Sequence, residues 1–165
     1  MIVAMATFPP VAARPNTLYV EHPTRADMQD ESYFVKDVVP YIDAHYTTLA
    51  EPCGRLLTGF CASGNGAMWL LLRHLELFGR AAVWETWLDL THMHEPDEQQ
   101  VGDDTTFQRY CCRNLIHVQE HRQRLRDGPT RIIVLTHRSD RDPASSLACS
   151  NFPARATRRG YSTRL

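Results

Sequence analysis

The chain has 165 residues, of which 43% are apolar and 22% are charged, and its formal net charge is −1. This length suits one domain with a hydrophobic core, and the apolar content with three Trp excludes a wholly disordered chain. The near-zero charge argues against bulk nucleic-acid binding. No apolar run approaches the ~18 residues of a membrane helix. We therefore expect a globular protein without a nucleic-acid or membrane partner.

The charge is unevenly distributed along the chain. Residues 1–136 carry a net charge of −5 and residues 137–165 a net charge of +4. The second segment is rich in Arg, Ser, Ala, Pro and Thr and has no apolar period, which predicts an irregular or disordered basic tail. The first residues lack a positive region before their short apolar run, so we expect a cytoplasmic protein.

The cysteines give no framework for a disulfide-rich or zinc-ribbon protein. Their number is odd, their spacing is irregular, and no CxxC pair occurs. We therefore expect reduced thiols at Cys53, Cys61, Cys111, Cys112 and Cys149.

The first predicted elements are a strand, a loop and a kinked helix. Residues 1–7 form an apolar run that predicts a buried strand, and residues 9–30, rich in Pro and polar groups, predict a long loop. Asp30 or Ser32 can cap the helix that follows, in which Phe34, Val35, Val38, Val39, Tyr41 and Ile42 recur at helical spacing. Pro40 predicts a kink in this helix because it lacks an N–H group.

The remaining elements alternate between strands and helices. Residues 55–60, 80–84 and 131–136 predict strands, and residues 67–78 predict a buried helix that Gly79 ends. A second helix is expected from Asp103 or Asp104 to about Arg126, with Phe107, Tyr110, Cys111, Leu115, Val118 and Leu125 toward the core. This alternation predicts an α/β fold, a three-layer α-β-α sandwich with a mostly parallel sheet. Ligands of such sheets bind at the carboxyl ends of the strands.

The turn after the second predicted strand has the pattern of a nucleophile elbow. Gly59-Phe-Cys-Ala-Ser-Gly64 lies between a strand and a buried helix, as G-x-S-x-G does in α/β-hydrolases. Cys61 holds the nucleophile position, and the Ala62 N–H is the expected oxyanion donor. The positive end of the helix favours the thiolate form of a cysteine placed there. A Gly-rich turn is also the general way to join a strand to a helix, so a purely structural turn remains the alternative.

Longer segments resemble one family of esterases. Residues 33–46 are similar to its F-x-x-[DE]-[LV]-[LIV]-P-Y-I-[DE]-x-x-Y segment, including the otherwise unusual Pro40. Residues 54–64 resemble the strand that leads into its G-F-S-x-[GS]-G elbow, and residues 67–82 resemble the next helix and strand. Residues 1–136 thus resemble the esterase family of α/β-hydrolases that contains esterase D-like and enterochelin esterase-like proteins. The elbow is also similar to the G-[FY]-C-x-G-G elbow of the dienelactone hydrolases, which use a Cys-His-Asp triad.

The resemblance implies hydrolysis of a small-molecule carboxylic ester or thioester by a catalytic triad, without a metal or organic cofactor. Position by position, it places the nucleophile at Cys61 and the oxyanion donor at Ala62, and it leaves Asp140 as the nearest candidate for the acid. The family's histidine lies further along, and this chain has no histidine after His137. The family also has earlier strands, one of which leads to a second oxyanion donor.

Other side chains are candidates for the same edge of the sheet. His92, His94 or His137 could replace the missing base, and His92-Met-His94 with Glu95 and Asp97 could be metal ligands, although a solvated loop is the commoner reading. Glu85, Asp89 and Trp87 could contact substrate, or form a solvated rim and pocket wall. Ser63 could act as nucleophile in place of Cys61 or simply fill the turn.

Two functions follow from these observations. The first is ester hydrolysis through the elbow at Cys61. The alternative is a catalytically incompetent, truncated or degenerate esterase homologue, at best a non-enzymatic binding module. The acyl group, the alcohol and the oligomeric state are not encoded in any recognisable pattern.

Overall fold

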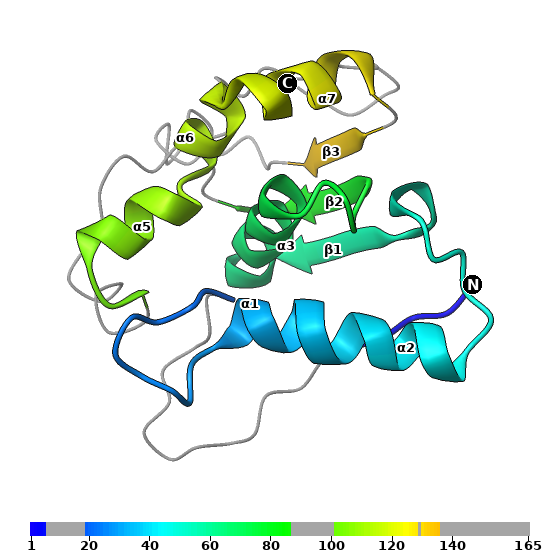
Figure 1. Ribbon diagram of the computed structural model, residues 1–165. Helices are drawn as coiled ribbons and strands as arrows, with labels where there is room; N and C mark the ends of the chain where they lie inside the picture. Colours follow the sequence, from blue (N-terminus) through cyan, green and yellow to red (C-terminus); the bar gives the residue numbers. More distant parts are fainter. Residues whose placement is uncertain (6–18, 87–100, 129, 136–165) are drawn as a thin grey trace.

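The computed structural model describes residues 1–5, 19–86, 101–128 and 130–135 (Figure 1). Three parallel strands, β1 (Leu56–Phe60), β2 (Arg80–Trp84) and β3 (Arg131–Leu135), form a sheet in the order β1-β2-β3. Each strand agrees with its predicted range to within one residue at either end. The sheet and its crossover helices confirm the predicted α/β class.

Helix α3 (Ala62–Arg73) connects β1 to β2 and occupies the centre of the molecule. Residues 64–72 are all buried, which confirms the helix that was expected to be apolar on every side. Its limits differ from the predicted 67–78, because the Gly- and Ser-containing segment after Cys61 forms its first turn. The helix ends at Arg73, and a separate turn at residues 74–77 leads to β2.

The other helices lie on either side of α3 (Figure 1). α1 (Asp30–Ser32), the π-helical turn η1 (Tyr33–Val38) and α2 (Val39–His45) form one continuous helical segment, and η2 (Pro52–Gly54) is a short 3₁₀ turn before β1. α5 (Asp104–Tyr110), α6 (Cys112–His117) and α7 (Gln119–Asp127) connect β2 to β3.

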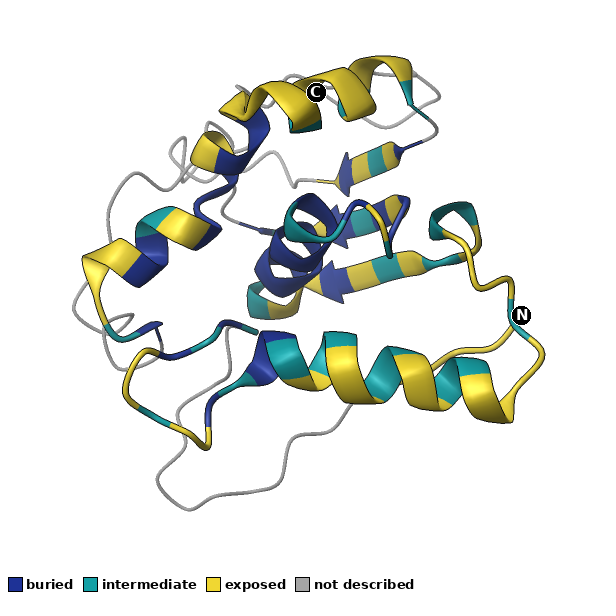
Figure 2. Cartoon of the chain, viewed as in Figure 1, coloured by how far each residue is buried: buried dark blue, intermediate teal, exposed yellow. Residues whose placement is uncertain are grey.

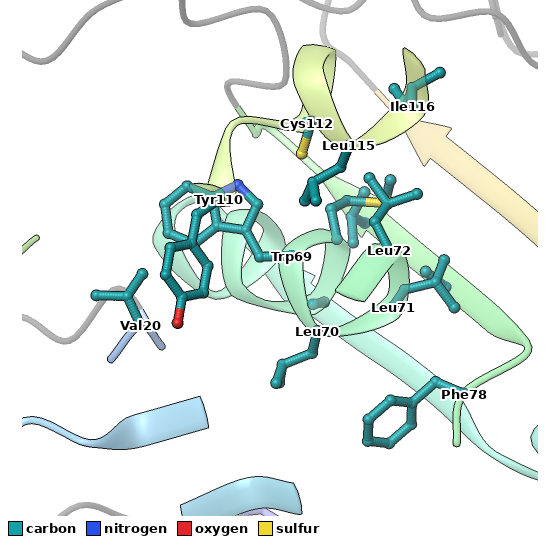
Figure 3. Close-up of a cluster of buried hydrophobic side chains, with 14 of the residues drawn as sticks. Val20, Trp69, Leu70, Leu71, Leu72, Phe78, Tyr110, Cys112, Leu115 and Ile116 are labelled. Carbon is teal, nitrogen blue, oxygen red and sulfur yellow. The ribbon is translucent and has the colours of Figure 1, made fainter. Parts of the chain in front are cut away.

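The core forms where these helices meet one face of the sheet (Figure 3). Trp69 of α3 packs against Tyr110 of α5, and Leu115 of α6 closes the same cluster. The sheet contributes its inward positions, which are Leu57, Ala81, Val83, Ile132 and Val134. Figure 2 shows the resulting buried centre in α3 and the exposed outer surface of α7.

The opposite face of the sheet is exposed in the described part of the chain. Leu56, Phe60, Trp84, Ile133 and Leu135 alternate with the inward positions, and each is 39% exposed or more. Parallel strands commonly carry apolar residues on both faces, because both faces are usually covered. Phe60 and Trp84 contact one another on this face, with ring centroids 6.2 Å apart.

Two predictions near the start of the chain are wrong. Residues 1–5 form no strand: they are exposed and pair with neither edge of the described sheet. Asp30 and Ser32 do not cap the helix: it begins at Asp30 after Gln29, and no side chain caps it.

Pro40 deforms its helix in the way its chemistry requires. The turn before it, Tyr33–Val38, is π-helical, and the α-helical geometry resumes at Val39. A proline ring collides with the carbonyl one turn earlier, so a wider turn relieves the contact. The structure thus shows a change of helix type before Pro40, and the predicted kink itself stays a prediction.

The predicted helix from 103 to 126 is divided into three. Cys111 (ψ 118°) and Val118 (ψ 125°) leave helical geometry and reorient the chain. Asp103 caps α5 as predicted, since its carboxylate accepts a hydrogen bond from the Thr106 N–H at 2.6 Å. The first break places both Cys111 and Cys112 in the interior, whereas Val118 is exposed instead of buried.

A buried carboxylate holds the far end of α3. Glu31 is 5% exposed and accepts hydrogen bonds from Arg73 Nε (2.8 Å), His74 Nε2 (2.6 Å) and the Tyr110 hydroxyl. Burial opposes the charge on Glu31, but these hydrogen bonds lower its pKa to about 2. The Glu31 hydrogen bond raises the pKa of His74 against the effect of burial.

We predict that the contribution of this network to the free energy of unfolding falls at low pH through Glu31 and at higher pH through His74. The contribution of Glu31 is complete above its unfolded pKa of 4.5 and is lost as the pH falls toward 2. The contribution of His74 is complete below its unfolded pKa of 6.5 and is lost as the pH rises through its raised folded value. Glu31→Gln should lower the free energy of unfolding near pH 6 by about 3 kcal/mol, because it removes the buried carboxylate that pairs with the partly buried Arg73 and His74.

Urea denaturation between these pH limits measures the effect. Glu76→Gln is the matched control, since Glu76 contacts the same imidazole at 3.1 Å but is exposed, and should cost less than about 1 kcal/mol. Equal losses of unfolding free energy in Glu31→Gln and Glu76→Gln would contradict the stabilising role given to Glu31.

Candidate functional site

The backbone reverses at a single residue between β1 and α3. β1 ends at Phe60, α3 begins at Ala62, and Cys61 between them has φ 55° and ψ −123°. L-residues rarely adopt such a positive φ, and residues held there cluster at functional sites. The chain therefore makes a sharp turn with a positive φ at Cys61, between a strand and a helix.

Hydrogen bonds to the sheet and to the helix hold Cys61 in this conformation. Its N–H donates to the carbonyl of Trp84 at 3.1 Å, which continues the ladder between β1 and β2. Its carbonyl accepts from the N–H groups of Gly64 (2.9 Å) and Asn65 (3.1 Å), which start α3. Both backbone polar groups of Cys61 are therefore satisfied by the elements that it joins.

Small residues permit the close approach of strand and helix. A Cβ atom on Gly59 would lie 2.2 Å from the Ser63 carbonyl oxygen, so no larger residue fits without movement of the turn. A Cβ on Gly64 would lie 3.0 Å from the Thr86 Cβ, a tight contact with a side chain. Below the turn, the buried Thr86 hydroxyl donates to Asn65 Oδ1, which ties the end of β2 to the first turn of α3.

The start of α3 presents backbone donors beside Cys61. The first described intrahelical donors are Gly64 and Asn65, so the N–H groups of Ala62 and Ser63 precede them. Such groups, with the helix dipole, favour negative charge at this end of the helix. The Ala62 N–H belongs to this first turn, and Cys61, the residue before it, is partly exposed.

Glu85 lies at the corresponding point of the next strand. The register pairs Phe60 with Trp84, so Glu85 follows β2 where Cys61 follows β1. It also has a positive φ, 51°, and its N–H donates to the Leu135 carbonyl at 3.1 Å. The structure thus brings two of the predicted site residues to the same carboxyl edge of the sheet.

A third residue beside the turn at Cys61 was missed in the sequence analysis. Tyr19 falls in the segment predicted as loop, yet its hydroxyl lies 3.0 Å from Ser63 Oγ and its ring packs against Gly66. No local pattern could have revealed this contact, because it joins positions far apart in the chain.

Several predicted site residues lie outside the described residues. These are Trp87, Asp89, His92, His94, Glu95, Asp97, His137 and Asp140, together with the tail at 137–165. Within the described ranges, no group of three or more His, Cys, Asp and Glu side chains is arranged to hold a metal ion. None of the helices that the structure describes is long and apolar enough to cross a membrane.

Comparison with known families shows the family of the chain. The family described as "Putative esterase" matches residues 8–147. The chain belongs to this esterase family. The match confirms the resemblance drawn from residues 33–46 and from the elbow. Comparison with curated protein sequences gives no significant match.

Two solved structures share the α/β fold of this chain. A ferulic acid esterase shares 14% identity, with 73% of this chain and 56% of that chain covered and a TM-score of 0.50. An S-formylglutathione hydrolase from Agrobacterium tumefaciens shares 15% identity, with 79% of this chain and 57% of that chain covered and a TM-score of 0.54. This esterase-family chain therefore spans a little over half the length of each, and the likeness at these identities concerns the α/β fold.

We predict that the backbone strain at Cys61 appears as a difference in the free energy of unfolding between two variants. Cys61→Gly should be more stable than Cys61→Ala by about 1 kcal/mol, because glycine adopts a positive φ without steric cost. Both variants remove the thiol, so the difference isolates the backbone. Urea denaturation at one pH gives the two free energies, and equal values would mean that the turn is not strained.

We also predict that Gly59 is required for the turn. Gly59→Ala should lower the free energy of unfolding by about 2 kcal/mol or more, because the added Cβ meets a backbone oxygen that cannot move alone. Gly64→Ala is the matched control and should cost less, since its added Cβ would lie 3.0 Å from the Thr86 Cβ and 3.2 Å from the Gly59 carbonyl oxygen, both less severe than 2.2 Å. Thermal unfolding of both variants is the measurement, and a larger loss in Gly64→Ala would refute the prediction.

Proposed function

We propose that this chain hydrolyses carboxylic esters or thioesters through Cys61, with the Ala62 N–H as an oxyanion donor. The observation that carries the proposal is the positive φ of Cys61 between a parallel strand and the buried helix α3. Membership of the esterase family supports the reaction class. No metal or organic cofactor is invoked.

The chemistry proceeds in two steps. The Cys61 thiolate attacks the carbonyl carbon of the ester, the carbonyl electrons move to its oxygen, and the Ala62 N–H faces the resulting negative charge. Collapse restores the carbonyl, breaks the bond to the alcohol oxygen and leaves a thioester on Cys61, while the departing alkoxide takes up a proton. Water then cleaves the thioester, releasing the acid and the thiol.

The thiol proton must be removed by a base. No described histidine hydrogen-bonds to Cys61, and the sequence offers His92, His94 and His137 for this role, with Asp140 as the acid. Glu85, beside Cys61 at the edge of the sheet, and Trp87 would contact the substrate. These assignments complete the proposal around the elbow.

Hydrolysis of p-nitrophenyl acetate tests the proposal. The native chain should release p-nitrophenol, and Cys61→Ala should reduce kcat/KM by at least about 100-fold, as expected for loss of a nucleophile. Cys53→Ala is the control, because Cys53 is a second partly exposed thiol, placed in η2. It should retain native activity.

The other outcomes separate the alternatives. Turnover that survives Cys61→Ala but is lost in Ser63→Ala would move the nucleophile to Ser63. Absence of turnover in the native chain would contradict the proposal and support the catalytically incompetent homologue.

A further inference from the structure

The strained residues of the described chain converge on the elbow. Three non-glycine residues in the described ranges have a positive φ, which are Tyr19 (62°), Cys61 (55°) and Glu85 (51°). Cys61 and Glu85 lie side by side after paired strands, and the Tyr19 side chain reaches the first turns of α3. Strain persists only where surrounding structure enforces it, and it gathers at active sites.

The backbone beside Tyr19 is anchored in the core. Val20 is 1% exposed, and its carbonyl accepts a hydrogen bond from the Asp30 N–H at 3.1 Å. The next residue, Glu21, donates its N–H to the Tyr110 hydroxyl at 2.9 Å. This anchoring holds Tyr19 at its unfavourable φ and directs its ring toward α3.

The Tyr19 side chain is fixed on two sides before it reaches the elbow. Its ring lies 5.6 Å from the Phe34 ring, and a Cβ on Gly66 would lie 2.2 Å from its Cδ2 atom. Glycine at position 66 therefore allows the ring to lie directly against α3. The hydroxyl then meets Ser63 Oγ at 3.0 Å, two residues after Cys61.

We propose that Tyr19 is a positioning residue for the elbow, an inference that rests on the proposed function. Its hydroxyl holds Ser63, and thereby the first turn of α3 with the Ala62 N–H and Cys61. The donors at a helix start stabilise a thiolate and an oxyanion only while that turn is formed. Tyr19 acts through Ser63 and touches no reacting atom.

Tyr19→Phe removes the hydroxyl and keeps the ring against Gly66. It should lower kcat for p-nitrophenyl acetate about fivefold, the effect expected of one lost neutral hydrogen bond, with KM nearly unchanged. Tyr33→Phe is the matched control, since the Tyr33 ring also contacts the Phe34 ring, and this variant should retain native kcat. Ser63→Ala should lower kcat to a similar degree, and adding Tyr19→Phe to it should cause no further loss.

A second readout does not depend on ester turnover. Iodoacetamide alkylation of Cys61, measured by peptide mass spectrometry relative to Cys53 in the same sample, should slow about threefold in Tyr19→Phe and stay native in Tyr33→Phe. If the native chain has no esterase activity, the proposed function fails while this ratio still decides the role of Tyr19. An unchanged alkylation ratio or an unchanged kcat in Tyr19→Phe would overturn the inference, as would equal effects in Tyr33→Phe.

Discussion

The passage from β1 to α3 through Cys61 is the constraint on which the arrangement depends. Because one residue makes the reversal, the strand and the helix begin in contact, and only glycine fits at position 59. The same contact places the start of the buried helix α3 at the carboxyl edge of the sheet. The positive φ, the close packing and the position of the first N–H groups of α3 are thus three consequences of one backbone geometry.

The two ends of α3 are fixed by different interactions. At its start, the Thr86–Asn65 hydrogen bond and the Tyr19–Ser63 contact hold the first turn. At its end, the Glu31 carboxylate accepts hydrogen bonds from Arg73, His74 and the Tyr110 hydroxyl. Tyr110 also accepts from the backbone of Glu21, close to Tyr19, so the two ends are joined through the same segment. A helix held in this way can keep a strained residue at its start.

The sequence predicted the features that local chemistry determines. The strand at 131–135 and the sharp turn in Gly59–Gly64 were both recognisable, because strand propensity and turn chemistry act over a few residues. The breaks in the helix at Cys111 and Val118 were not recognisable, because apolar residues at helical spacing lie on both sides of each break. Tyr19 was missed because its importance arises from packing against residues more than forty positions away. Long-range contacts of this kind leave no trace in a local pattern.

The most direct test of Cys61 as the nucleophile is the site at which an acyl group becomes attached. The native chain is mixed with p-nitrophenyl acetate, quenched in acid after a short time and analysed by peptide mass spectrometry. The account predicts one acetyl group on the peptide containing Cys61, which neutral hydroxylamine removes because it is a thioester. Cys61→Ser should carry no acetyl group that hydroxylamine removes in this way. An acetyl group on Ser63, or acetylation of Cys53 to the same extent as Cys61, would contradict it.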